Sequence, residues 1–224
     1  MNPSLRIEVH FDLICPWCLI GKRHLAAALQ DFRRLRPDIS VELVWKSREL
    51  LPGTPPAGLP YQAFYERRLG SRGAVAARRA QVQEAAAPAG IQFAFERIQV
   101  MPNTRSAHRL IALAKSECGP AGTAALIERL FTGYFLRGEN IGDPKVLSRI
   151  AGEFGVGQAR LADALAAPAG SDLDADLDAP DVSGVPYFVF NGRYPLSGAH
   201  PAETLLQMMQ LATLEIPMVE SVVV

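Results

Sequence analysis

The sequence predicts an α/β fold in which a large all-helical segment interrupts a domain built of strands and helices. Alternating apolar residues mark strands near both ends of the chain, at residues 5–11, 39–45 and 187–190. Helical patterns without a clear strand signal fill most of the chain between them. The chain has 224 residues, which is long for one compact domain and suits a core domain that carries an insertion.

The composition excludes several classes of protein. Lys+Arg and Asp+Glu both number 23, so the formal net charge is zero, and there is no electrostatic case for a nucleic-acid or membrane-surface partner. Hydrophobic residues make up 49% of the chain, too many for disorder. No apolar run approaches the ~20 residues of a transmembrane helix. The first residues lack a signal-peptide pattern, so we expect a cytoplasmic protein.

The first three elements read as strand, helix and strand. The strand at residues 5–11 is followed by a Cys-Pro-Trp-Cys motif at residues 15–18 and then by helical spacing of apolar residues, which Pro37 helps to end. A second strand follows at residues 39–45. The default connection for such a unit is a right-handed crossover, so the two strands are expected to be parallel.

The middle of the chain is expected to be helical. Residues 51–60 are rich in proline and glycine and predict a linker. Asn103 is expected to cap the third helix after it, and Asp143 to cap the helix that begins at Pro144. Residues 172–181 are expected to form a short helical turn or a loop. The predicted helices are residues 61–69, 73–87, 103–117, 121–137, 144–154 and 158–166.

The end of the chain returns to strands. Asn191-Gly192 separates the strand at 187–190 from a second alternating run, and this dipeptide predicts a type I′ hairpin. A last helix is expected to begin near Pro201. We therefore assign an outer domain and an insertion domain, with the outer domain formed by residues 1–56 and 183–224 and the insertion by residues 57–182.

The cysteine pair has the setting of a redox-active dithiol. Between a strand and a helix, Cys15 would lie at the helix N-terminus, where unpaired N–H groups and the helix dipole favour a thiolate. Cys18, further into the helix, is expected to be more buried and less ionised. Cys15 would then act as nucleophile and Cys18 as resolving thiol. Two alternatives are a zinc site, which would need two more ligands from the scattered histidines, and a pair of inert thiols. Cys118 is expected to have no role.

The Val185-Pro186 dipeptide comes directly before the strand at residues 187–190. Cis X-Pro bonds prefer tight turns, although on base rates alone a trans bond is favoured. A cis bond would turn the backbone groups of Val185 outward, where they could pair with an extended substrate beside Cys15. The cysteine pair is what makes this interpretation the better one.

Three separated stretches resemble the FrnE-like branch of the DsbA-family thiol–disulfide oxidoreductases: FDLICPWCLIGKRHL, NTRSAHRL and VSGVPYFVFNGRYPLSGAHP. The resemblance implies a thioredoxin-like fold with a DsbA-like helical insertion. This branch is similar in architecture to 2-hydroxychromene-2-carboxylate isomerases and kappa-class glutathione transferases. In those relatives a serine commonly holds the first cysteine position, so two intact cysteines favour an oxidoreductase.

The resemblance also implies site residues and partners. The catalytic residues would be Cys15, Cys18 and Pro186. No tightly bound cofactor and no metal is implied, but some members of the branch use glutathione, which is therefore a candidate co-substrate. The other partners would be disulfide-containing proteins or small thiols, and relatives with this insertion are often homodimers. The residues assigned to substrate binding are Pro16, Trp17, Val185, Ser197, Gly198 and Asn103.

Three functions stay open at this point. The first is a thiol–disulfide oxidoreductase, and the second is a glutathione-dependent isomerase or transferase that uses the same cleft. The third is a holdase-like binding module with incidental cysteines. Two histidines add little: His10 could neighbour the thiolate, and His108 is expected to be a packed or solvated helix residue.

Overall fold

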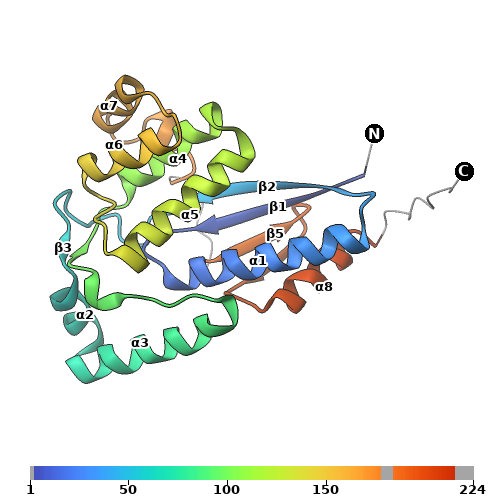
Figure 1. Cartoon of the computed structure of the whole chain (residues 1–224), viewed down its shortest axis with the longest axis horizontal. Coiled ribbons are helices and arrows are strands. Elements are labelled where there is room, and N and C mark those ends of the chain that lie inside the picture. The colour runs from blue at the N-terminus through green and yellow to red at the C-terminus, as the bar shows by residue number, and fades with distance from the viewer. Residues whose placement is uncertain (1–2, 178–183, 215–224) are drawn as a thin grey trace, which may run out of the picture.

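A four-stranded sheet forms the centre of the molecule, with strand order β2-β1-β5-β6 (Figure 1). The computed structural model describes residues 3–177 and 184–214. Strand β1 (Ser4–Phe11) pairs in parallel with β2 (Ser40–Ser47), as the strand–helix–strand pattern predicts. Strand β5 (Tyr187–Phe190) pairs antiparallel with both β1 and β6 (Tyr194–Ser197). The chain therefore returns to its first strand after the helical segment.

Two helices lie side by side along the sheet (Figure 1). Helix α1 (Pro16–Leu35) follows β1 and buries an apolar stripe that includes Leu25, Leu29 and Phe32. Helix α8 (Ala202–Ala212) buries Leu205 and Met209. Both helices were predicted, since their apolar residues recur at helical spacing.

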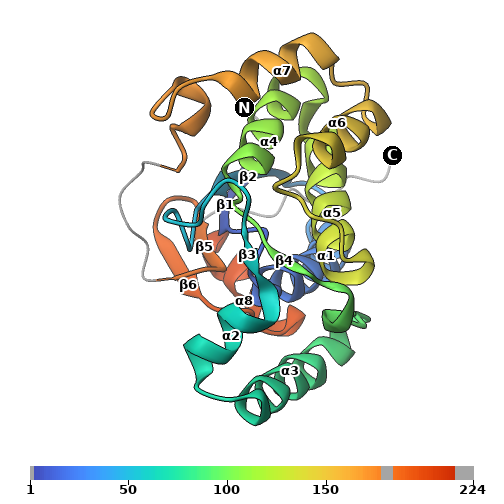
Figure 2. The same cartoon turned by 90° about the vertical axis from the view of Figure 1, so that its left-hand side faces the viewer.

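The helices of the middle segment fall into two groups. In Figure 2, α4 to α7 gather above the sheet, whereas α2 and α3 lie below it. None of the helices that the structure describes is both long enough and apolar enough to cross a bilayer. The predicted positions are confirmed to within two residues at each end: α2 (Tyr61–Leu69), α3 (Arg72–Ala86), α4 (Arg105–Glu117), α5 (Gly119–Arg137), α6 (Pro144–Glu153) and α7 (Gln158–Ala166).

A second, two-stranded sheet was not predicted. Strand β3 (Leu59–Pro60) pairs antiparallel with β4 (Val100–Met101), and the Tyr61 N–H donates to the Gln99 carbonyl. The prediction of a linker over residues 51–60 is thus wrong at its last two residues. Each strand has only two residues, too few for an alternating pattern to appear in the sequence. The pairing fixes the start of α2 against the segment that precedes α4.

The turns and caps follow their expected chemistry, with one correction. The Asp143 side chain accepts the Lys145 N–H at the start of α6, as predicted. The backbone φ values of Asn191 and Gly192 are both positive, at 50° and 67°, as a type I′ turn requires. The N-cap position of α4 falls at Thr104, one residue after Asn103, although the Asn103 side chain does accept the Arg105 N–H as a cap would.

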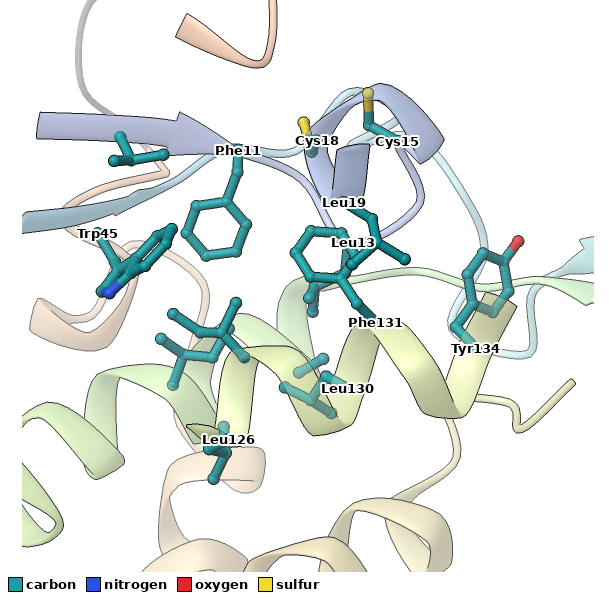
Figure 3. Packing of buried hydrophobic residues seen from close by; sticks show 14 of the residues in the cluster. Phe11, Leu13, Cys15, Cys18, Leu19, Trp45, Leu126, Leu130, Phe131 and Tyr134 are labelled. Atoms are coloured by element: carbon teal, nitrogen blue, oxygen red, sulfur yellow. The ribbon is translucent and has the colours of Figure 1, made fainter. Parts of the chain in front are cut away.

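The core joins the sheet to the inserted helices. Figure 3 shows Leu130 and Phe131 of α5 facing Phe11 and Leu13 at the end of β1. Phe11 also contacts Trp45 of β2, with ring centroids 5.7 Å apart. The helical segment and the outer strands thus share one continuous core. The division into residues 57–182 and the rest stays a prediction, and its second boundary lies outside the described residues.

Candidate active site

The two cysteines of the Cys-Pro-Trp-Cys motif lie at the start of α1. Cys15 is the N-cap residue, and Pro16 takes the first helical position, where a missing N–H costs nothing. The Cys15 N–H donates to the Asp12 carbonyl at 3.1 Å, which closes the turn between β1 and α1. Both side chains are buried, with Cys15 exposed by 6% and Cys18 by 2%. The sequence-based placement of Cys15 at the helix N-terminus is confirmed.

Burial raises the pKa of the Cys18 thiol well above its usual value, and the neighbouring Cys15 sulfur raises it further. Cys18 is therefore a protonated thiol at neutral pH, as expected from its position inside the helix. Figure 3 shows the two sulfur atoms next to each other above the core. The geometry suits a pair in which the Cys15 sulfur contacts the substrate and the Cys18 sulfur lies buried next to it.

The loop before β5 lies against Cys15. The Val185–Pro186 peptide bond is cis, and the Val185 carbonyl oxygen is 3.6 Å from the Cys15 Sγ, which donates to it. Gly21 of α1 leaves room for this loop, because a Cβ there would lie 3.1 Å from the Pro186 Cγ. The structure thus brings together Cys15, Val185 and Pro186 from opposite ends of the chain.

Gly198 joins this loop from the other side. Its N–H donates to the Pro186 carbonyl at 2.8 Å, and its φ of 102° lies in the region that favours glycine. Ser197, the last residue of β6, is exposed and pairs in register with Tyr187. Both predicted residues are therefore neighbours of the cis-proline loop.

A buried acid–base pair lies beneath the motif. Asp12 and His108 are fully buried or nearly so, and the His108 Nε2 is 3.1 Å from the Asp12 Oδ1. The other carboxylate oxygen of Asp12 accepts the Leu50 N–H at 2.7 Å. The charge of Asp12 adds to the causes that raise the pKa of Cys18. His108 is a packed helix residue as expected, but sequence reasoning missed Asp12, whose signal was a lone acid after an apolar strand.

His10 does not join the dithiol. Its ring is buried, its Nδ1 lies 3.2 Å from the Arg48 Nη2, and its Nε2 lies 4.0 Å from Glu8. Burial and then the charge of Arg48 lower the pKa of His10. The idea that His10 neighbours the thiolate is thus not supported, because the ring is held by groups of its own strand and of the segment after β2.

A cavity of about 460 Å³ opens beside Cys15. The start of α1 contributes to its wall Pro16 and Trp17, two of the residues assigned to substrate binding from the sequence. Sequence reasoning missed the opposite wall, which α2 and α3 supply: Tyr61, Phe64, Tyr65, Arg68, Arg78 and Arg79. Those helices were predicted, but their docking against the cysteines depends on the β3–β4 pairing, which no periodic pattern in the sequence indicates.

Asn103 lies apart from this cavity. Its side-chain amide donates to the Thr54 carbonyl at 2.7 Å, and its Oδ1 accepts the Arg105 N–H at 3.0 Å. It is not among the residues that line the cavity. The structure therefore uses Asn103 to fix the backbone before α4, and does not bring it to the cysteines.

Cys118 also lies away from the motif. It sits between α4 and α5, is partly exposed, and its Sγ is 3.6 Å from the Phe154 carbonyl oxygen. Nothing connects it to Cys15 or Cys18 within residues 3–177 and 184–214. That the third thiol has no part in the chemistry stays a prediction.

Comparison with known proteins gives one family match over most of the chain. A family model described as DSBA-like thioredoxin domain matches residues 6–210. The structure is also similar to that of a probable DsbA oxidoreductase from Streptomyces coelicolor, with a TM-score of 0.82 and 28% identity. That similarity covers 97% of this chain and 94% of the other.

Two further structures share the fold. One is a 2-hydroxychromene-2-carboxylate isomerase, with a TM-score of 0.62, 14% identity, and coverage of 94% of this chain and 97% of the other. The second is the cytosolic disulfide reductase DsbM from Pseudomonas aeruginosa with GSH, with a TM-score of 0.59 and 18% identity. The similarity covers 94% of this chain and 96% of the DsbM chain.

Proposed function

Because this chain belongs to the family of DSBA-like thioredoxin domains and is an enzyme that acts on disulfides or related substrates, we propose that it is a thiol–disulfide oxidoreductase that works through Cys15 and Cys18. One observation supports this most. The Cys15 sulfur faces the Val185 carbonyl at 3.6 Å, on the rim of a cavity, while Cys18 lies buried behind it. The nucleophile is thus within reach of a substrate, and the resolving thiol is within reach of the nucleophile.

The proposed chemistry has two exchanges. The Cys15 thiolate attacks one sulfur of a substrate disulfide, the S–S bond breaks, and the first substrate thiolate leaves. The Cys18 thiolate then attacks the Cys15 sulfur, which releases the second substrate thiolate and leaves a Cys15–Cys18 disulfide. Two electrons pass from the dithiol to the substrate, and the two thiol protons pass to the solvent. An oxidase would run the same steps in reverse.

The residues around the dithiol have matching roles in this proposal. Pro16 holds the first turn of α1, so that Cys15 stays at the helix N-terminus. The Val185 backbone, turned toward Cys15 beside the cis bond, would hold an extended substrate segment there. Trp17, which is partly exposed and lines the cavity, would contact the bound substrate.

We propose glutathione as the thiol that recycles the dithiol. A structure with this fold, DsbM, is described with GSH and as cytosolic, and we place the present enzyme in a reducing, cytoplasmic compartment as well. Ser197 and Gly198, beside the cis-proline loop, would hold the tripeptide. A homodimer stays a prediction from the resemblance alone.

A glutathione-dependent isomerase or transferase is the second candidate. It is favoured by the fold shared with a 2-hydroxychromene-2-carboxylate isomerase and by the cavity with aromatic walls beside Cys15. In that case Cys18 would be dispensable. Turnover of an aromatic substrate with glutathione by a Cys18→Ser variant would support this candidate over the first.

The oxidoreductase function predicts that a Cys18→Ser variant traps a covalent intermediate. With no resolving thiol, attack on glutathione disulfide should stop at a mixed disulfide on Cys15, because Cys18 can no longer displace the glutathione. The measurement is the intact mass after acid quench, followed by peptide mapping of the modified cysteine. A Cys118→Ser variant is the matched control and should form no stable adduct, as the wild type should not.

Three results would contradict the proposal. One is a Cys18→Ser protein that stays unmodified under conditions in which free cysteine reacts. Another is an adduct that forms on Cys118 and leaves Cys15 free. A Cys15→Ser variant that still exchanges disulfides would also exclude Cys15 as the nucleophile.

A further inference from the structure

We propose that the cavity beside Cys15 binds small disulfides whose body is aromatic and carries a carboxylate. The inference rests on the proposed function and deepens it, since it names the class of substrate that the dithiol would reduce. It is carried by the size of the cavity, by the rings that line it, and by the charge of its wall.

The size and the walls of the cavity suit a planar aromatic body. Its volume of about 460 Å³ lies within the range of about 300–1,000 Å³ that small-molecule sites occupy. Tyr61 and Tyr65 meet edge to face with ring centroids 4.9 Å apart, and Phe64 meets Tyr65 at 5.2 Å. With Trp17 opposite, these rings offer both faces and edges for stacking. A flexible peptide would gain less from such a surface.

The charged residues of the wall are all positive. Arg68, Arg78 and Arg79 line the cavity, and no Asp or Glu is among its lining residues. None of the three forms an ion pair with a carboxylate in the described part of the chain. Arg78 lies over the Trp17 ring at 5.6 Å and Arg79 over the Tyr61 ring at 5.3 Å. Three unneutralised guanidinium groups beside a nucleophilic sulfur favour an anionic ligand.

The hydrogen-bond donors of the wall favour the same kind of ligand. The Arg79 Nε is buried and has no hydrogen-bond partner among the described residues, so it lacks an acceptor. Burial raises the pKa of Tyr61 and, together with the Cys15 charge, that of Tyr65, so both hydroxyls stay neutral and add no negative charge to the wall. A carboxylate supplies the acceptor that the Arg79 Nε lacks.

The sulfur chemistry fits a disulfide of that class. With the aryl ring in the cavity, its disulfide would lie at the wall that Cys15 forms. The Cys15 thiolate breaks the aryl S–S bond and one aryl thiolate leaves. Cys18 then displaces the second aryl thiolate, and the enzyme is left with the Cys15–Cys18 disulfide. The two electrons come from the reduced enzyme, so no further reductant is needed in a single turnover.

The test compares an anionic and a neutral aryl disulfide. The reduced enzyme, with Cys118→Ala to remove the third thiol, is mixed with dithiobis(nitrobenzoate) or with neutral dithiobis(nitropyridine), and the released aryl thiolate is followed by absorbance. Each rate constant is divided by that of free glutathione with the same reagent. We expect the normalised rate constant to be larger for the anionic reagent than for the neutral one. In Arg68→Gln/Arg78→Gln this preference should fall about fivefold or more. High salt should also reduce it.

The matched control changes two arginines of the same helices that lie outside the cavity, Arg67→Gln/Arg72→Gln. All four side chains are exposed, so folding should survive in both variants. If the arginines only change the reactivity of the thiolate, the rate constants with both reagents change equally. The effect then cancels in the ratio of the anionic to the neutral reagent. An anion preference that is absent, or that falls equally in the control variant, would overturn the proposal.

A binding measurement separates this proposal from the proposed function. Calorimetry on a Cys15→Ser protein, which cannot exchange disulfides, should show naphthoate binding more tightly than neutral naphthamide, with the difference reduced in Arg68→Gln/Arg78→Gln. Equal affinities would overturn the assignment of the cavity even if the dithiol is active. If naphthoate binds preferentially but Cys15 and Cys18 of the wild type never form a disulfide, the cavity assignment stands and the oxidoreductase function is contradicted.

Discussion

Cys15 and Cys18 are only three positions apart in the chain, yet the fold gives them different surroundings. Cys15 caps α1 on the rim of the cavity, whereas Cys18 is buried in the core close to Asp12. Burial is the largest cause of the raised pKa of Cys18, and the charge of the neighbouring Cys15 adds to it. In the proposed function, this difference lets Cys15 attack and Cys18 resolve.

The raised pKa of Cys18 predicts a pH-dependent second step. Because the thiolate is the attacking form and the pKa lies well above neutrality, its fraction should rise about tenfold per pH unit between about pH 6 and 8. Burial remains once Cys15 is in a mixed disulfide, although the Cys15 charge is then lost. Rapid-quench measurement of the release of the second thiol gives this rate. A rate that is constant over that range would show that Cys18 is not the group that titrates.

At the scale of single residues, the sequence could predict what depends on neighbours along the chain. The cysteine pair, Pro16 and Pro186 each carry a local signature. Arg79 and Asp12 could not be assigned in the same way, because a lone charged residue has many uses. Only the packing of α3 against the start of α1 gives Arg79 a cavity, and only the approach of α4 gives Asp12 its partner His108.

Among the elements, α4 holds the segment that leads back to the sheet. Arg109 of α4 is buried and donates to both oxygens of Asp174 at 2.8 Å, and also to the carbonyls of Ala164, Ala167 and Pro168. One guanidinium thus fixes the end of α7 and the short 3₁₀ turn η3 (Asp172–Asp174). The arrangement is buried, so its loss leaves a charge without a partner.

Asp174→Ala should therefore lower the free energy of unfolding by about 3 kcal/mol, since it breaks a buried ion pair from one side. Asp172→Ala, in the same turn but exposed, is the matched control and should stay within about 0.5 kcal/mol of wild type. Urea unfolding at pH 7 measures both. Equal stability of the two variants would show that the Arg109–Asp174 pair does not hold this segment.

The same pair has a defined pH dependence. The hydrogen bonds from Arg109 are the main cause that lowers the pKa of Asp174, so its contribution is present above the unfolded-state pKa of about 3.9. It is lost as the pH falls through the still lower pKa of the folded state. The difference between wild type and Asp174→Ala should hence persist at pH 5 and shrink below about pH 4.

At the scale of elements, helices were the more predictable part. Their apolar periodicity and their caps, such as Asp143-Pro144 and Gly138, are local signals, and the structure has these caps where the sequence predicts them. The pairing of β3 with β4 joins residues about forty positions apart through two residues each, and no periodic pattern records it. This missed contact matters because it places α2 where it can line the cavity.

In the whole molecule, the site is made where the two ends of the chain meet the inserted helices. The sheet order brings β5 beside β1, so that the cis-proline loop reaches the cysteines from the far end of the sequence. The helices α2 and α3, in the lower part of Figure 2, supply the opposite wall of the cavity. The order of elements predicted this fold class, whereas the docking of α2 and α3 depends on the β3–β4 pairing and on packing between distant segments.

The central claim, that Cys15 and Cys18 cycle as a pair, is tested most directly by equilibrium with glutathione. The protein is incubated in buffers of stepped GSH and GSSG ratio and quenched with acid, and the state of each cysteine is read by mass. We predict a reversible Cys15–Cys18 disulfide that appears as the buffer becomes more oxidising, in wild type and in Cys118→Ser alike. Its midpoint gives the direction in which the enzyme works. A stable glutathione adduct on Cys15 beside a free Cys18, or no oxidation across the range, would contradict the claim.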